Sequence, residues 1–252
     1  MPRALNLLRR SVHYRRECFD VGLKAAGFEL VERVDRPAAG DLLLCWNRYG
    51  AAAEMADHFE RHGARVLVVE NCPLGNDLHG GSYSLARRHV AVTGGTWQYG
   101  GPARWDSWGI NLRPFRTGGA ETVIFGQRGI GHSDVRSPDG WAQAVQRRIG
   151  GRIREHPGTG LAMPLWEDLI NARDVVTWSS AAALQAMAMG VPVWYDHPGF
   201  VGAPAAWPVS TYGADPKRDD GARLEVFRRL AWAIWTLDEI RSGAAIRTAL
   251  GE

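Results

Sequence analysis

Short apolar runs alternate with helical periods along the chain of 252 residues. In the first half, each run is bounded by turn residues or by a periodic segment, which is the pattern of buried strands. Strands that alternate with helices are typical of a parallel sheet with crossover connections. The strands expected in the first half cover residues 5–8, 28–31, 41–46 and 65–69.

Two helices are expected between these strands. The first ends at Gly27 and the second at Gly63, and glycine commonly closes a helix because it adopts the left-handed backbone conformation without strain. Apolar residues at helical spacing predict the buried face of the first helix. Its members are Tyr14, Cys18, Val21 and Ala25.

The second half repeats this alternation. A stripe of Trp141, Val145 and Ile149 predicts one helix, and an alanine-rich segment predicts another over residues 181–189. Apolar positions from Leu224 to Leu237 predict a C-terminal amphipathic helix. The strands expected in this half cover residues 122–125, 152–154, 174–178 and 191–195.

The fold class expected is therefore α/β, with two doubly wound sheets. A glycine-containing segment at 116–120 separates the two series, so the predicted domains are residues 1–116 and 117–252. The stretch from 70 to 116 is mostly irregular, with one strand expected at 89–92. Long irregular segments in compact domains are more often functional than idle.

Composition and charge limit the possible partners and location of the protein only broadly. A formal charge of +3 permits an anionic partner without requiring one. No apolar run is long enough for a membrane span and the start lacks a secretory signal, so a cytoplasmic protein without membrane contact is expected. The three cysteines are widely spaced and are expected to be reduced thiols.

The most informative chemistry lies in three loops of the second half, each after a predicted strand. Open α/β sheets bind ligands at the carboxyl ends of their strands. A serine pair at the start of a helix favours an anion, arginines make charge-assisted contacts to phosphate, and glycines allow close backbone approach. These loops predict a polyphosphate site. Its candidate residues are Gln127, Arg128, Gly129, Arg154, His156, Ser179 and Ser180.

His156-Pro157 followed by Ser179-Ser180 resembles the HP and SS motifs of bacterial GT-B transferases that build sialyl and Kdo capsular polymers. The resemblance covers roughly residues 122–195. It implies a GT-B-like fold, in which two Rossmann-like domains face each other across a cleft, and a metal-independent glycosyltransferase. It also implies that the histidine and the serines hold the phosphate of a nucleotide-sugar donor, with no further cofactor.

A second, broader resemblance is to phage-borne proteins of glycosyltransferase type. It rests on the Gln127 to Gly131 turn, the Glu70-Asn71 segment and the apolar run at 230–237. Some phage glycosyltransferases decorate hydroxymethylated pyrimidines in DNA. The resemblance implies DNA as the acceptor and partner, and the host cytoplasm as the location.

The acceptor side is expected in the first domain. A carboxylate or histidine must take the proton of the acceptor hydroxyl if the transfer inverts the anomeric centre. Asp77 is the first candidate because it follows a strand end near His79, and Glu70 and Asp106 come next. An ordinary turn at 75–77 is the alternative.

Basic and aromatic residues interleave over the irregular stretch, as expected for phosphate contact and stacking on an exposed base. Surface arginines and core tryptophans are the alternative. No nucleic-acid-binding motif is present. The acceptor candidates are Asn71, Asn76, Arg87, Arg88, Trp97, Arg104 and Trp105.

No metal site is expected, because the Asp-x-Asp motif of many other glycosyltransferases is absent and Asp219-Asp220 fits a solvated charge cluster. Three functions stay open. They are transfer to a hydroxymethylpyrimidine in DNA, which is favoured, transfer to a polysaccharide or small molecule, and non-catalytic binding of a nucleotide or nucleic acid. The sugar, the nucleotide, the stereochemical outcome and the oligomeric state are not determined by the sequence.

Overall fold

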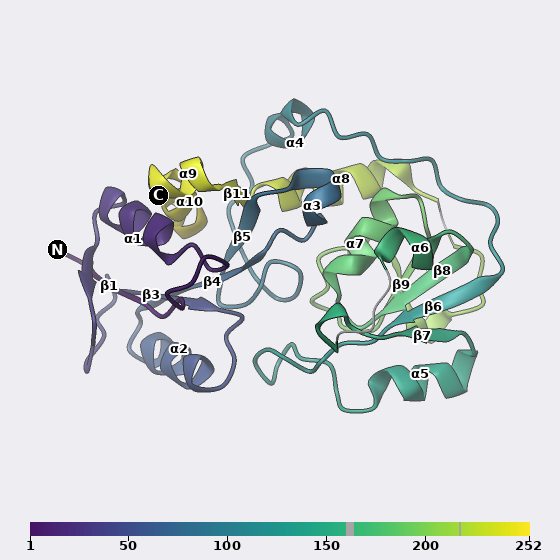
Figure 1. Ribbon diagram of the computed structural model, residues 1–252, viewed down its shortest axis with the longest axis horizontal. Helices are drawn as coiled ribbons and strands as arrows, with labels where there is room; N and C mark the ends of the chain where they lie inside the picture. Colours follow the sequence, from purple (N-terminus) through teal and green to yellow (C-terminus); the bar gives the residue numbers. More distant parts are fainter. Residues whose placement is uncertain (160–163, 217) are drawn as a thin grey trace. The chain divides into compact units, whose positions relative to one another are not determined.

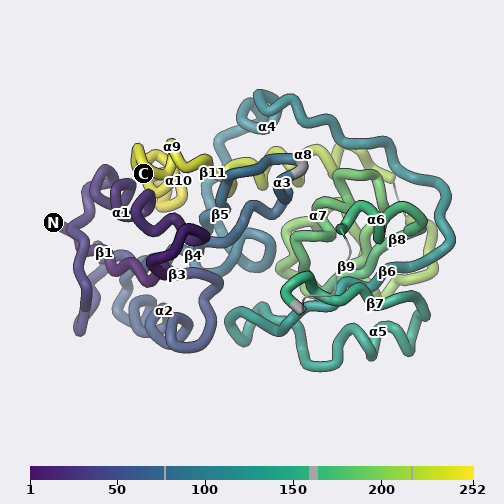
Figure 2. Tube along the Cα trace, in the orientation of Figure 1, coloured from purple at the N-terminus to yellow at the C-terminus, as the bar shows by residue number. Residues whose placement is uncertain are grey.

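The chain forms two compact units in the computed structural model, which describes residues 1–159, 164–216 and 218–252, apart from the side chains of Asp77 and Thr159. The first unit contains Met1–Gly101, Gly131–Asp134 and Leu230–Glu252. The second unit contains Pro102–Ile130 and Val135–Arg229. Each unit has its own sheet covered by helices (Figures 1 and 2).

The first unit is built on a six-stranded sheet. Its strands are β1 (Arg3–Asn6), β2 (Glu29–Val31), β3 (Leu42–Trp46), β4 (Arg65–Asn71), β5 (Ser82–Arg87) and β11 (Ile234–Thr236). The order across the sheet is β11-β5-β4-β3-β1-β2. The four neighbouring strands β4, β3, β1 and β2 are parallel to one another. Strand β5 is antiparallel to both β4 and β11.

Helices cover both faces of this sheet. The helices are α1 (Arg16–Ala25), α2 (Ala51–Arg61), α3 (Gly75–His79), α9 (Leu237–Arg241) and α10 (Ala244–Leu250). Leu42 and Leu44 of β3 share a core with residues of α1, α9 and α10, whereas Leu43 and Cys45 share one with α2 (Figure 1). Burial on both faces explains why β3 is apolar at successive positions.

The second unit has five parallel strands in the order β10-β9-β8-β6-β7. They are β6 (Glu121–Phe125), β7 (Arg152–Arg154), β8 (Ala172–Thr177), β9 (Val193–Tyr195) and β10 (Trp207–Pro208). The helices are α4 (Ala103–Ser107), α5 (Trp141–Ile149), α6 (Leu165–Leu169), α7 (Ala181–Ala188) and most of α8 (Asp220–Ala231). Helices α5 and α7 lie on opposite faces of the sheet (Figure 1).

The α/β class is confirmed, although β5 and β11 add antiparallel pairs to the first sheet, and the strands predicted from apolar runs are present with small shifts at their ends. Two details are wrong. Residues 89–92 form no strand, and the strand of this region is β5, which the sequence pattern did not indicate. Val21 was expected on the buried face of α1 but is 53% exposed. The buried residues of α1 are Cys18, Phe19, Gly22 and Leu23.

The predicted C-terminal helix from Leu224 to Leu237 is also corrected. Helix α8 ends at Ala231, and β11 follows because residues 234–236 pair antiparallel with β5. This pairing puts the last part of the chain in the first unit, and Pro102–Arg116 belongs to the second. The two units therefore differ from the predicted domains 1–116 and 117–252. Their arrangement across a cleft stays a prediction.

The structure describes the state of the cysteines and the length and apolar character of the helices. Cys18, Cys45 and Cys72 are all free, as predicted. Within the residues that the structure describes, no helix combines the length and the apolar character needed to cross a membrane.

Candidate functional site

Strands β6 and β8 mark the point in the second unit where the chain reverses its direction across the sheet. From β6 the chain goes through α5 to β7 on one side, and then crosses back to β8 on the other side. The loops after β6 and β8 leave toward opposite faces, because parallel crossovers are right-handed. A crevice at the carboxyl ends of such a strand pair is the common ligand site of open α/β sheets.

A direct hydrogen bond joins the loops after β6 and β8. The backbone N–H of Ser179 donates to Oε1 of Gln127 over 2.9 Å, and Ser179 is buried. Gly129 in the same β6 loop has a φ of 63°, a left-handed conformation that favours glycine. The predicted donor residues of these two loops therefore lie together at the edge of the sheet.

Ser180 caps helix α7. Its Oγ accepts a hydrogen bond from the N–H of Ala182 over 3.2 Å, and its own N–H donates to Oγ1 of Thr177 over 2.7 Å. The cap uses a lone pair of the serine oxygen and leaves its O–H proton as a donor. The alternative role of Ser180 as a helix cap is thus observed, and it is compatible with a further contact to an anion.

His156 lies in the loop after β7. The N–H of Gly158 donates to its Nδ1 over 2.9 Å, which assigns the proton of the neutral ring to Nε2. Burial lowers the pKa of His156, and the charges of Arg128 and Arg154 lower it further. A Cβ placed on Gly158 would lie 2.9 Å from Nη1 of Arg128, so the β6 and β7 loops also approach closely. The ring is a neutral donor beside an arginine.

Arg154, at the end of β7, is buried in an ion pair. Its side chain is 7% exposed, and its Nε donates to Oδ2 of Asp168 over 2.5 Å. Asp168 also accepts from Nη1 of Arg152 over 2.7 Å. Arg154 therefore has an ion-pair role through Nε and an electrostatic effect on His156, and its contact with a donor phosphate stays a prediction.

A hollow of about 220 Å³ lies next to the β6 loop. This volume is below the range of drug-sized pockets and is large enough for part of a ligand. Its charged lining residues are Arg128, Asp139 and Glu155. The other lining residues are Gly126, Gln127, Gly129, Ser137, Pro138, Gly140, Trp141, Ala142, Gln143 and Ile153.

Three residues expected on the acceptor side belong to the second unit instead. Trp105 is 2% exposed and packs on Phe227 with ring centroids 5.1 Å apart, so it is a core residue and no stacking platform. The guanidinium of Arg104 lies over the ring of Trp108. Asp106 pairs with Arg228 through both carboxylate oxygens, at 3.2 and 3.1 Å, and this ion pair disfavours a role as a general base.

The other acceptor and base candidates lie in the first unit. Glu70 in β4 accepts the backbone N–H of Asn71 over 2.8 Å. Asn71 and Asn76 are exposed, and Arg87 and Trp97 are half-buried. The backbone of Asp77 lies in α3, while its side chain, and with it the predicted catalytic carboxylate, falls outside the described part of the chain.

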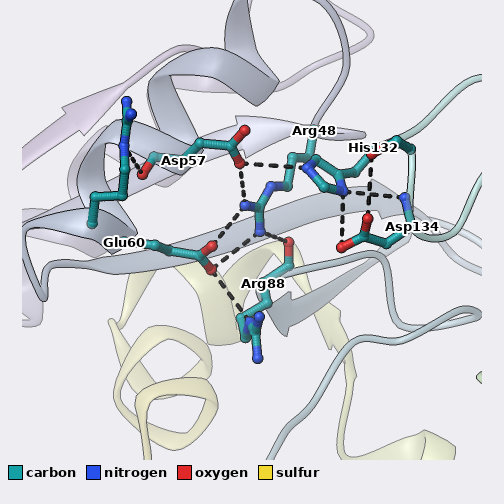
Figure 3. Close-up of polar contacts among 8 residues, drawn as sticks. Arg48, Asp57, Glu60, Arg88, His132 and Asp134 are labelled. Atoms are coloured by element: carbon teal, nitrogen blue, oxygen red, sulfur yellow. Dashed lines mark hydrogen bonds and ion pairs between the residues drawn. The ribbon is translucent and has the colours of Figure 1, made fainter.

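The first unit holds a polar network around Arg48 (Figure 3). The Arg48 side chain is 4% exposed, and its Nη2 lies 2.6 Å from both Asp57 Oδ1 and Glu60 Oε2 of α2. Its Nη1 donates to the carbonyl oxygen of Arg88 over 2.7 Å. Arg48 has a φ of 43°, which is uncommon without glycine and is concentrated at functional sites.

Two histidines and a carboxylate stand beside this network. His132 Nε2 lies 3.5 Å from Asp57 Oδ1, and its Nδ1 lies 3.4 Å from Asp134 Oδ2 (Figure 3). Burial and the charge of Arg48 lower the pKa of His89 to about 4. No sequence pattern singles out Arg48, His132 or Asp134, and the signal near the last two is a run of polar residues at 132–134.

Known proteins share the fold but not the sequence. No protein-family model matches the chain, and no curated protein matches it either. The solved structure of Thermosulfurimonas dismutans KpsC described as a beta Kdo 2,7 transferase is similar over 100% of both chains, with a TM-score of 0.60 and 12% sequence identity. A second KpsC structure, a beta Kdo 2,4 transferase, has a TM-score of 0.49 and 15% identity over 97% of this chain and 90% of the other.

The buried Arg154–Asp168 pair predicts that two similar carboxylate-to-amide substitutions lower the free energy of unfolding by different amounts. Asp168→Asn leaves a buried guanidinium without its counter-charge, so we expect the free energy of unfolding to fall by roughly 3 kcal/mol. Glu121→Gln removes the other carboxylate on Arg152, where both side chains are about a third or more exposed, and we expect a loss below about 1 kcal/mol. Urea denaturation followed by tryptophan fluorescence measures both, and equal losses would contradict the assignment.

The shifted pKa of His156 predicts a pH dependence. The folded pKa is lowered, so the unfolded chain takes up the proton first as the pH falls below about 6.5, and stability is lost below that value. His156→Asn keeps an acceptor for the N–H of Gly158 and does not titrate. Between pH 7 and 5, we expect the free energy of unfolding of this variant to change less with pH than that of the wild type does. Urea denaturation at each pH measures it. His62→Gln, an exposed position, should retain the wild-type dependence.

Proposed function

We propose that this chain is a glycosyltransferase that binds a nucleotide sugar at the carboxyl ends of β6, β7 and β8. The observation that carries the proposal is the meeting of three loops at the reversal point of the second sheet, with Gln127 bonded to Ser179 and Arg128 beside His156. The shared fold with a Kdo transferase supports the reaction class, since that protein is itself a sugar transferase.

The donor phosphate would contact three groups of different kinds. Arg128 is exposed and has no ion pair with any carboxylate in the described part of the chain, so its charge is available to an anion. The Nε2–H of His156 and the O–H of Ser180 are neutral donors. A neutral histidine donates to phosphate without requiring protonation near pH 7.

Arg154 serves this proposed site indirectly. Held by Asp168, it brings a buried positive charge close enough to lower the pKa of His156, although its guanidinium is used in the ion pair. Replacing Arg154 would therefore disturb the fold as well as the electrostatics. Arg128 is the better position for testing donor binding because it is exposed.

As the acceptor, we favour a hydroxyl of a saccharide or small molecule over a hydroxymethylpyrimidine in DNA. The burial of Trp105 and the ion pair of Asp106 remove one predicted stacking residue and one predicted base from the DNA hypothesis. Arg87, Arg88 and Trp97 stay as predicted contacts to DNA. The base also stays a prediction, with Asp77 and Glu70 as candidates.

Donor binding is tested by thermal shift with nucleotides and nucleotide sugars, including Kdo donors. Ligand at about 100 times its Kd stabilises the native state by about 2.7 kcal/mol, so a specific nucleotide should raise Tm. We expect Arg128→Ala to weaken binding at least tenfold. Ser180→Asp retains a good helix cap but adds a negative charge beside the phosphate, so it should keep the fold and lose the shift. Arg147→Ala, an exposed residue of α5, is the matched control.

Transfer itself is tested by incubating the full chain with each donor that binds and with two acceptor panels, oligosaccharides and hydroxymethylated DNA. Added mass on an oligosaccharide is the expected result. Glycosylated DNA would restore the DNA hypothesis, and binding to that DNA should weaken steeply with salt because counterions are released. Nucleotide binding without transfer to any acceptor would favour a non-catalytic binding protein.

A further inference from the structure

We propose that His89, His132 and Asp134 form a binding site for a divalent transition metal in the first unit. Each residue offers one ligand atom, and these atoms all lie within 4.8 Å of one another. The three residues come from the segment after β5 and from Gly131–Asp134, both of which belong to the first unit. The inference does not depend on glycosyl transfer.

The spacing of two of the ligand atoms already matches a coordination sphere. His132 Nδ1 and Asp134 Oδ2 are 3.4 Å apart. Zinc bonds to nitrogen and oxygen of about 2.0–2.1 Å, arranged tetrahedrally, place neighbouring ligand atoms about 3.3 Å apart. His132 Nδ1 accepts the backbone N–H of Asp134 over 3.3 Å, so a metal at this nitrogen replaces that hydrogen bond. The ligand atom of His89 lies within 4.8 Å of the other two.

His89 supplies the independent observation that points to a ligand. The residue is 9% exposed, and its Nδ1 is a buried atom without a hydrogen-bond partner. A buried polar atom of this kind costs free energy unless it gains a partner. The ring lies 5.5 Å from the ring of His132, centroid to centroid. A metal held by both rings would satisfy this nitrogen.

The carboxylates near the three residues outnumber the neighbouring arginines by one. The arginines are Arg48 and Arg88, and the carboxylates are those of Asp57, Glu60 and Asp134. With His132 Nδ1 on the metal, its Nε2–H faces Asp57 Oδ1 at 3.5 Å (Figure 3). A carboxylate that orients a ligating histidine in this way is typical of metal sites.

The ligand set selects the kind of metal. Two imidazoles and one carboxylate suit zinc and neighbouring transition metals, whereas magnesium and calcium prefer oxygen ligands alone. The Asp134 side chain is 67% exposed and that of His132 is 18% exposed. The site is therefore reachable from solvent and leaves a coordination position open, as in sites where a metal binds a water or a substrate.

This proposal departs from the expectation that no metal is used. That expectation rested on the absence of an Asp-x-Asp motif. The three residues proposed here are separated by up to 45 positions in the chain, from His89 to Asp134. No spacing rule in the sequence connects them, and only the fold brings them together.

The test measures Zn²⁺ binding to the full chain after treatment with a chelator, by competition with a chromogenic chelator. The background is His58→Gln/His62→Gln, because the rings of the partly exposed His58 and the exposed His62, at the end of α2, have centroids 4.5 Å apart and could bind zinc on their own. We expect one equivalent of zinc in this background. Co²⁺ in place of Zn²⁺ should give the visible absorption of a four-coordinate site.

Three single variants on that background should each lower zinc affinity at least tenfold and abolish the cobalt spectrum: His89→Phe, His132→Ala and Asp134→Asn. Glu54→Gln, at an exposed position of α2, is the control and should bind as the background does. Circular dichroism of the metal-free variants checks that each one folds. Unchanged stoichiometry and affinity in the three variants, or loss of all binding in the background alone, would overturn the proposal.

Discussion

The parallel pairing of β6 with both β7 and β8 is the constraint on which the proposed donor site depends. Because parallel strands end at the same edge of a sheet, three loops that are far apart in the sequence meet there. The hydrogen bond between Gln127 and Ser179 fixes two of these loops to each other. The short strand β7 brings His156 to the same edge, where the charges of two arginines act on it.

Both units bury an arginine next to a proposed site and neutralise it with carboxylates. Arg154 uses Asp168 in the second unit, and Arg48 uses Asp57 and Glu60 in the first. A buried guanidinium is costly without such partners. The ion pair of Arg154 anchors the end of β7, which precedes His156, and Arg48 also donates to the carbonyl oxygen of Arg88, next to His89.

The sequence predicted the parts of the fold that depend on apolar runs, because the central residues of β3, β4, β6 and β8 are buried and mostly apolar. It missed β5 and β11. The Ser82–Arg87 strand alternates polar and apolar residues within a glycine-rich stretch, and Ile234–Thr236 continues the apolar period of α8. Both strands are defined by pairing with each other, which no local pattern reports. The same limit hid Arg48 and the histidine pair.

Two neutral histidines illustrate how burial can prepare one side chain for different chemistry. In both His156 and His89, burial lowers the pKa and nearby arginines lower it further. The difference lies at Nδ1, which accepts the N–H of Gly158 in His156 and has no partner in His89. A ring with its Nδ1 occupied presents Nε2–H as a donor to an anion. A buried ring with an unsatisfied nitrogen instead has a lone pair for a cation, so the hydrogen-bond pattern around each ring, rather than its charge, separates the two proposed sites.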